Sequence, residues 1–129
     1  MLSVNDIAAW GITHPWASAD QVEQDLLLSR AICAIAANDY LGGELVFRGG
    51  TALHKLHLLS PLRYSEDLDY VRTTGGGIRR LTEELLGLGR GLGFDVGSRM
   101  SEQPKFYWRT TSQAGTNQRA VTCLTSGLR

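Results

Sequence analysis

The chain has 129 residues, and its 13 basic and 13 acidic side chains leave a formal net charge of zero. This length allows one domain with a modest core, and the neutral balance argues against a protein that coats nucleic acid through charge alone. Because no apolar run approaches the ~20 residues of a membrane span and the N-terminus lacks the basic cluster of a signal peptide, we expect a cytoplasmic protein with no membrane partner.

The N-terminal part is predicted to be irregular at first and then helical. Glycine and proline interrupt the first 17 residues, which are therefore expected to lack regular structure. The serine at position 18 can cap a helix over residues 18–41, where apolar side chains recur at helical spacing. The glycine pair 42–43 is expected to end this helix, and residues 45–47 to form a short strand.

The remaining elements predict a sheet with helices against it. Residues 51–60 are expected to form a short helix that stops before a proline, and residues 65–72 a strand. A glycine-rich turn leads to a helix over residues 78–93, whose four glycines weaken its C-terminal part. FDVGS, KFYWRT and RAVTCLT are three further strand candidates. This order predicts a mixed α/β (α+β) sheet with flanking helices, in one domain over residues 1–129.

Two cysteines stand far apart in the chain, Cys33 and Cys123. In a reducing compartment they are expected to be free thiols, and Cys33, within the apolar stretch AICAIAAN, is expected to lie in the core. No CxxC or paired-histidine spacing accompanies them, so a cysteine-ligated metal site is not expected.

A glycine pair, Gly49 and Gly50, separates the first predicted strand from the short helix that follows it. Glycine lets a ligand approach the backbone closely, and a helix N-terminus attracts anions. Thr51 adds a hydroxyl group, and Lys55 lies one helical turn further on, where it either meets a triphosphate or stays in solvent. A phosphate loop and a tight strand-to-helix turn both fit this pattern when it is taken alone.

The second feature is the carboxylate pair Asp67 and Asp69. Side chains alternate between the two faces of a strand, so these carboxylates are expected to share one face, with Leu68 and Tyr70 on the other. Their mutual repulsion is relieved by a divalent cation, and Mg²⁺ takes one or two protein carboxylates together with substrate phosphates. A solvated strand edge is the alternative for an isolated D-x-D.

Arg63 and Ser65 stand just before the carboxylate pair. Arg63 either holds a phosphate or a carboxylate of a ligand bidentately or forms an ion pair with Glu66 or Asp67. Ser65 either binds a phosphate or caps the turn before the strand.

Several other residues have a functional and a plainer interpretation. Tyr107 and Trp108 either stack on a base or, as aromatics in a strand, pack in the core. His54 and His57, at i, i+3 spacing, either line a nucleotide pocket or lie half-buried at the surface. The Arg79–Arg80 pair either touches a nucleic-acid backbone or is a solvated helix start.

The segment FRGGTALHKLHLLSPLRYSEDLDYV joins both features in one compact unit. It resembles the GG-x-A-L…R-x-S-x-D-x-D signature of the AbiEii/AbiGii-type nucleotidyltransferase toxins, over about residues 47–71, with weaker resemblance as far as FYWRTTSQAGTNQR. The resemblance implies a DNA-polymerase-β-like nucleotidyltransferase fold. It also implies triphosphate-binding roles for Gly49, Gly50, Lys55, Arg63 and Ser65, and catalytic and Mg²⁺-binding roles for Asp67 and Asp69. Thr51, the variable position of the signature, is a further candidate for phosphate binding through its hydroxyl group.

The same resemblance implies an activity and partners. It predicts a toxin of a toxin–antitoxin or abortive-infection system that transfers a nucleotide from a nucleoside triphosphate to an acceptor such as a tRNA 3′ end. A neutralising antitoxin is the implied protein partner. Mg²⁺ is the implied cofactor.

The C-terminal part departs from the family pattern. Family members are longer and carry a third catalytic carboxylate on the strand that here reads RAVTCLTSGLR, yet no acid follows Glu102. Asp95 is the other candidate for a third ligand, and an exposed turn or strand position is its plainer interpretation. We therefore expect an incomplete nucleotidyltransferase domain that lacks the C-terminal region and has low or no turnover. A catalytically inactive truncated remnant that binds nucleotide or an antitoxin is the alternative.

Overall fold

The structure is a computed structural model that describes residues 3–14, 18–48, 67–112 and 118–126. The helices among these residues are α1 (Val4–Thr13), α2 (Ala19–Ala37), α3 (Leu41–Glu44) and α5 (Arg79–Gly91). The strands are β1 (Leu45–Arg48), β2 (Asp67–Arg72), β3 (Asp95–Arg99), β4 (Lys105–Thr111) and β5 (Gln118–Ser126). None of the described helices is long and apolar enough to cross a membrane.

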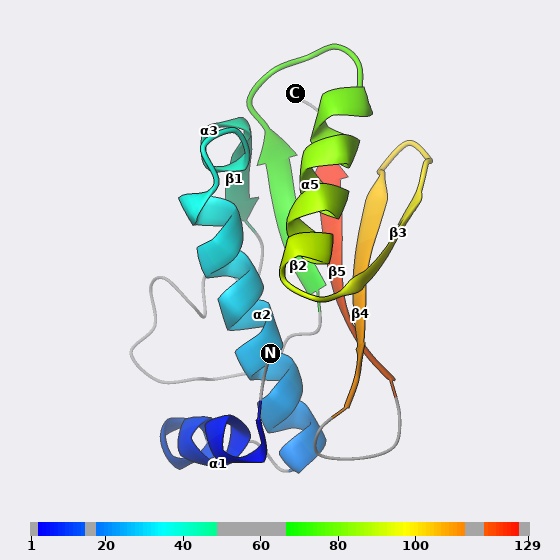
Figure 1. The fold of residues 1–129 in the computed structure, drawn as a ribbon. Coiled ribbons are helices and arrows are strands. Elements are labelled where there is room, and N and C mark those ends of the chain that lie inside the picture. Colours follow the sequence, from blue (N-terminus) through cyan, green and yellow to red (C-terminus); the bar gives the residue numbers. More distant parts are fainter. Residues whose placement is uncertain (1–2, 15–17, 49–66, 113–117, 127–129) are drawn as a thin grey trace.

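The described strands form one mixed sheet in the order β1-β2-β5-β4-β3 (Figure 1). β5 lies in the middle, parallel to β2 and antiparallel to β4. The two outer pairs, β1–β2 and β3–β4, are antiparallel. The predicted mixed sheet is therefore confirmed, and its strands lie close to the predicted positions.

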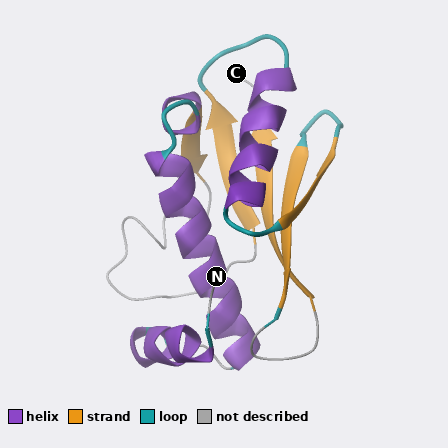
Figure 2. Cartoon of the chain, viewed as in Figure 1, coloured by secondary structure: helices purple, strands orange, loops and turns teal. Residues whose placement is uncertain are grey.

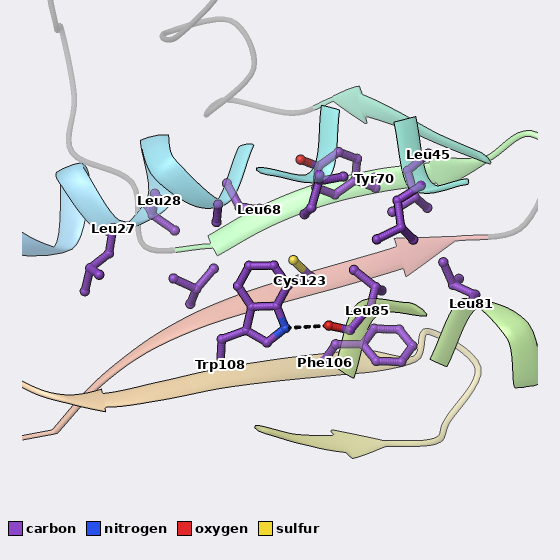
Figure 3. Close-up of a cluster of buried hydrophobic side chains, with 14 of the residues drawn as sticks. Leu27, Leu28, Leu45, Leu68, Tyr70, Leu81, Leu85, Phe106, Trp108 and Cys123 are labelled. Atoms are coloured by element: carbon purple, nitrogen blue, oxygen red, sulfur yellow. Dashed lines mark hydrogen bonds between the residues drawn. The ribbon is translucent and has the colours of Figure 1, made fainter. Parts of the chain in front are cut away.

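Helices α2 and α5 cover one face of the sheet (Figures 1 and 2). Between them and the sheet lies a core of alternate strand residues and the apolar sides of both helices (Figure 3). The core consists of Leu26, Leu27, Leu28, Ala31, Ile35, Leu41, Leu45, Leu68, Tyr70, Leu81, Leu85, Phe106, Trp108, Val121 and Cys123. Trp108 satisfies its buried indole N–H by donating to the carbonyl oxygen of Leu85, at 3.0 Å.

Residues Val4–Thr13 form a helix, so the irregular structure predicted for the start of the chain was wrong over this range. Ser3 and Asp6 form a capping box in which the Ser3 hydroxyl accepts from the Asp6 backbone N–H and the Asp6 carboxylate accepts from the Ser3 backbone N–H. Trp10 of this helix donates its indole N–H to the buried carboxylate of Asp25 on α2, at 2.7 Å. The cap and this contact outweigh the low helix propensity of Gly11.

Ser18 caps α2 as predicted, since its hydroxyl accepts from the backbone N–H of Gln21. The helix ends earlier than predicted, at Ala37 with Asn38 as its C-cap, instead of at the glycine pair. The Asn38 side-chain oxygen accepts from the backbone N–H groups of Tyr40 and Leu41 and so begins the short helix α3, which contains both glycines. An asparagine that bonds to nearby backbone groups in this way competes with continued helix.

The expected placement of the two cysteines was wrong for Cys33. Cys33 is exposed, whereas Cys123 on β5 is buried. The core side of α2 is set by residues such as Leu28, Ala31 and Ile35, and Cys33 lies off this stripe. Both thiols are free, as expected.

Buried polar contacts fix α2 to the ends of β4 and β5. Ser112 donates its hydroxyl to the buried carboxylate of Glu23, at 2.5 Å, and Arg119 forms ion pairs with Glu23 and Asp20. Gln24 donates its side-chain amide to the carbonyl oxygen of Ala120, at 2.7 Å. Because buried polar groups are costly unless paired, these contacts hold the helix in one position over β5.

Candidate functional site

The carboxylate pair lies on β2, on the face of the sheet opposite the helices. Leu68 and Tyr70 are buried toward α2, while Asp67 is exposed and Asp69 is half-buried. The predicted alternation is therefore confirmed. Two carboxylates two residues apart on one face project side by side, at a repeat of about 6.8 Å along the strand.

The far end of β2 is held by a buried ion pair. Arg72 contacts the carboxylate of Glu44 at 3.2 Å, and both side chains are almost fully buried. Arg72 also donates to the carbonyl oxygens of Gly76 and Gly77, and Thr74 donates its hydroxyl to the same Glu44 carboxylate. These bonds tie the turn after β2 to α3, so the strand that carries the aspartates is fixed at its C-terminal end.

The register of β5 identifies the side chains beside the aspartates. Thr122 is the partner of Asp67, and Leu124 is the partner of Asp69. Partners in a parallel pair point to the same face, and the buried pair Leu68 and Cys123 confirms this here. The strand expected to carry a third carboxylate thus runs directly beside the pair, and it presents a threonine and a leucine there.

Asp95 does not join the carboxylate pair. It is exposed at the start of β3, and β3 is separated from β2 by β5 and β4. Three strand spacings amount to about 14 Å, too far for Asp95 and the β2 aspartates to ligate one cation at 2.0–2.1 Å each, as Mg²⁺ requires. The plainer interpretation of Asp95, an exposed strand acid, is confirmed.

The buried side of the site is chemically inert. Burial, with a smaller contribution from the charge of Asp67, raises the pKa of the Cys123 thiol to about 12. Burial also raises the pKa of the Tyr70 hydroxyl well above its ordinary value. Both groups therefore stay protonated near neutral pH, and neither supplies a nucleophile or a base to the open face.

All six predicted nucleotide-binding residues lie outside the described residues, namely Gly49, Gly50, Thr51, Lys55, Arg63 and Ser65. The described strands fix where this segment begins and ends: β1 ends at Arg48, whose Cα is the register partner of Asp69, and β2 begins at Asp67. His54 and His57 also lie outside the described residues.

The donor set of the pair suits a magnesium ion that also binds a substrate. Among the residues that the structure describes, no group of three or more His, Cys, Asp or Glu side chains could hold a metal ion. Asp67 and Asp69 nevertheless offer two hard carboxylates on one face of β2, and Mg²⁺ completes its octahedron with waters and substrate phosphates where only one or two carboxylates are present. The residues therefore fit a cation that arrives with a phosphate ligand.

The two aromatic candidates on β4 point in opposite directions. Trp108 is in the core, as its plainer interpretation predicted, whereas Tyr107 is half-buried on the aspartate face. The guanidinium carbon of Arg109 lies 4.9 Å from the centre of the Tyr107 ring, a cation–π contact that was not predicted from the sequence. The i, i+2 spacing of an aromatic and an arginine on one strand is the signal that predicts it.

The arginine pair at the start of α5 belongs to the helical layer. Arg79 is exposed and bonds to Glu83 one turn along the helix, at 3.0 Å. Arg80 stacks over the Tyr40 ring, with 4.1 Å between the guanidinium carbon and the ring centre. Both contacts fit the plainer interpretation of a solvated helix start.

Comparison with known proteins gives one family. The family model described as "Nucleotidyl transferase AbiEii toxin, Type IV TA system" matches residues 30–122, which is more than half of the chain. No curated protein matches the chain.

Solved structures with the same fold include two bacterial proteins. JHP933 from Helicobacter pylori is 21% identical over 81% of this chain and 44% of its own, with a TM-score of 0.56. MenT4, a nucleotidyltransferase toxin from Mycobacterium tuberculosis, is 20% identical over 98% of this chain and 44% of its own, with a TM-score of 0.59. The chain thus has a nucleotidyltransferase fold and spans less than half the length of these solved structures.

Proposed function

The chain belongs to the AbiEii nucleotidyltransferase toxin family of type IV toxin–antitoxin systems, and from this premise we propose that it transfers a nucleotide from a nucleoside triphosphate to an acceptor hydroxyl with Mg²⁺. The observation that carries the proposal is the pair Asp67 and Asp69 on the open face of β2, beside the central strand of the sheet. The matched segment includes both aspartates and the glycine pair 49–50.

In the proposed reaction the acceptor hydroxyl attacks the α-phosphorus, the bond to the leaving oxygen breaks, and pyrophosphate departs. Asp67 and Asp69 would hold Mg²⁺ through their carboxylate oxygens, and bound Mg²⁺ supplies charge neutralisation to the triphosphate. The glycine pair and Thr51, with Lys55, Arg63 and Ser65, are proposed to bind the phosphates. Catalysis of this type rests on positioning and charge stabilisation, which a strand fixed at its far end by Arg72 and Glu44 supports.

The acceptor and the protein partner follow from the family. We propose a tRNA 3′ end as the acceptor, on the strength of the signature, and a cognate antitoxin as the partner, on the strength of the type IV assignment. A cytoplasmic location and a role in abortive infection belong to the same proposal, because tRNA and nucleoside triphosphates are found in the cytoplasm.

A second candidate function is nucleotide binding without turnover. It is favoured by Thr122 and Leu124, which occupy the positions beside the aspartates where the family resemblance implies a third carboxylate. With two carboxylates instead of three, the cation is held by fewer protein ligands. Triphosphate binding would survive this change better than catalysis, which depends on exact placement of the reacting groups.

The proposal is tested by incubating the purified chain with Mg²⁺, each labelled nucleoside triphosphate and total tRNA. Label on RNA is expected with the unaltered chain and should fall by about 100-fold or more in Asp67→Ala and Asp69→Ala, because a metal ion contributes several kcal/mol and each 1.36 kcal/mol is tenfold in rate. Asp95→Ala is the matched control, since it removes an exposed acid from the same face, about 14 Å away.

The two candidate functions give different results. Label that survives in Asp95→Ala and disappears in the two β2 variants supports the transferase. No label, together with Mg²⁺-dependent triphosphate binding that Asp67→Ala abolishes, supports binding without turnover. Triphosphate binding that is the same in all variants would contradict both.

A further inference from the structure

The aspartate face carries a second feature, which the candidate site does not use. Strand β4 places Lys105, Tyr107 and Arg109 on this face, and these three residues are called the β4 strip below. We propose that the β4 strip binds the single-stranded end of the nucleic acid that serves as acceptor, with one base stacked on Tyr107. The inference rests on the proposed function and names the surface that holds its acceptor.

The register places the strip in line with the carboxylates. Tyr107 is the partner of Thr122 on β5, and Thr122 is the partner of Asp67 on β2. Lys105 stands in the same relation to Asp69, through Leu124. Two strand spacings separate the strip from the aspartates, or about 10 Å.

That separation matches a short stretch of a nucleic-acid strand. Successive nucleotides of a stacked strand rise about 3.4 Å each, so about 10 Å corresponds to roughly three nucleotides. An acceptor whose terminal hydroxyl lies at the aspartates therefore carries its third or fourth base over Tyr107. This geometry favours a single strand, because its unpaired bases are free to stack on a side chain.

The strip has the chemistry of a stacking platform. The Tyr107 ring is half-buried and in contact with the Arg109 guanidinium, at 4.9 Å from ring centre to guanidinium carbon. A base stacks on an aromatic face whatever its identity, and an adjacent arginine adds cation–π attraction and a phosphate contact.

Glycine on β3 makes room for this arrangement. Gly97 is the partner of Tyr107, and a Cβ atom at position 97 would lie 3.3 Å from the Arg109 Nη1 atom. The absence of a side chain there leaves the guanidinium space to lie across the strand beside the tyrosine.

The charge of this part of the face suits a polyanion. Lys105 and Arg99 are register partners, and Arg109 faces the exposed Asp95. Three cations thus stand against one acid on β3 and β4, in a chain whose net charge is zero. A local excess of this kind binds phosphates in a salt-dependent way.

The test is binding of a 5′-fluorescein-labelled, eight-nucleotide single-stranded RNA, followed by fluorescence anisotropy without nucleoside triphosphate or Mg²⁺. Tyr107→Ala is expected to weaken binding about tenfold, whereas Tyr107→Phe, which keeps the ring, should bind like the unaltered chain. Arg109→Ala should weaken binding and reduce the slope of log affinity against log salt by about 0.7, the value of one lost phosphate contact to a single strand.

Arg80→Ala is the matched control, because Arg80 makes the same kind of contact with Tyr40 in the helical layer, at 4.1 Å. It should leave RNA binding unchanged, and circular dichroism checks that every variant is folded. An eight-nucleotide DNA should also bind, since base faces and phosphates are common to both nucleic acids. The proposal is overturned if Tyr107→Ala binds as tightly as Tyr107→Phe, if Arg80→Ala loses as much affinity, or if an eight-residue polyglutamate peptide binds as well as the RNA.

Failure of this inference is distinguishable from failure of the proposed function. RNA binding that requires Tyr107, without any nucleotide transfer, would support the role of the β4 strip and contradict the transferase. Nucleotide transfer that requires Asp67 and Asp69, together with an unchanged RNA affinity of Tyr107→Ala, would support the transferase and contradict the role of the β4 strip.

Discussion

At the scale of single residues, burial decides what each polar or reactive group can do. Asp67 is exposed and Asp69 is half-buried on the face opposite the helices, while Cys123 on β5, the register partner of Leu68, is buried. The exposed thiol of Cys33, on α2, is in the opposite situation. The reactivity of the two thiols therefore tests directly which of the two cysteines is buried.

We expect Cys33 to react with a thiol reagent in the native protein and Cys123 to react only after unfolding. A thiolate is the reactive form, and burial keeps Cys123 protonated. Titration with a chromogenic disulfide should detect one fast thiol in buffer and two in denaturant. The variant Cys33→Ser should show no fast thiol; a fast thiol that persists in it would contradict the burial of Cys123.

The raised pKa of Cys123 also predicts a loss of stability in alkali. The folded pKa is about 12 and the unfolded one about 8.5, so the stability is fully present below pH 8.5 and is lost as the pH rises toward 12. From pH 8.5 to 10 the free energy of unfolding should fall by about 1–2 kcal/mol. Urea unfolding at the two pH values measures this fall. It should be much smaller in Cys123→Ala, and an equal fall in that variant would assign it to other groups.

At the scale of elements, two glycines of helix α5 differ in how closely other side chains approach them. A Cβ atom on Gly89 would lie 2.5 Å from the Trp108 indole nitrogen, whereas nothing lies within 4 Å of one on Gly87. Gly89 therefore lets α5 approach β4 closely enough for Trp108 to donate to Leu85. The sequence alone presents both glycines as weaknesses of the helix.

We expect opposite effects from alanine at these two positions. Gly89→Ala should destabilise the protein by about 1–3 kcal/mol, because it overpacks the contact with Trp108. Gly87→Ala should stabilise it by roughly 0.5–1 kcal/mol, because it removes the entropic cost of an exposed helical glycine. Urea denaturation followed by tryptophan fluorescence measures both, and equal effects of the two substitutions would contradict the close approach of α5 to β4.

At the scale of the whole molecule, the parallel pairing of β2 with β5 assembles the site. This pairing places Thr122 beside Asp67, although the two residues are far apart along the chain. The strand order also keeps Asp95 away from the aspartate pair, and the register places Tyr107 in line with Asp67. The strand order and register of the sheet therefore set the position at which a third carboxylate could join the aspartate pair, and one substitution can test this position.

We expect Thr122→Asp to tighten Mg²⁺-dependent triphosphate binding, since it places a third carboxylate in the register position next to Asp67. Isothermal titration calorimetry with a nucleoside triphosphate and Mg²⁺ should show an affinity about tenfold higher, the effect of about 1.4 kcal/mol. Thr111→Asp, on the exposed end of β4, is the control for added charge. An equal gain in both variants would show a general charge effect and contradict the placement.

Local patterns determined much of this protein in advance. The alternation in β2 predicts that Asp67 and Asp69 share a face, because the period of a strand is two residues wherever the strand lies. The sequence predicts the strands of the sheet for the same reason, and the family signature predicts the family. The capping box of α1, formed by Ser3 and Asp6, is also a local signal. These two residues indicate a helix, so the irregular start was predicted wrongly although the sequence contains the signal against it.

The tertiary structure alone decided how these elements meet. The order β1-β2-β5-β4-β3 brings Thr122, Leu124 and Tyr107 into line with the aspartates and leaves Asp95 at a distance. It also decided that Cys123, and not Cys33, is buried. The physical reason is that residue spacing fixes which face of its own element a side chain occupies, whereas strand order, register and the side that a helix buries are chosen by packing between segments far apart in the chain.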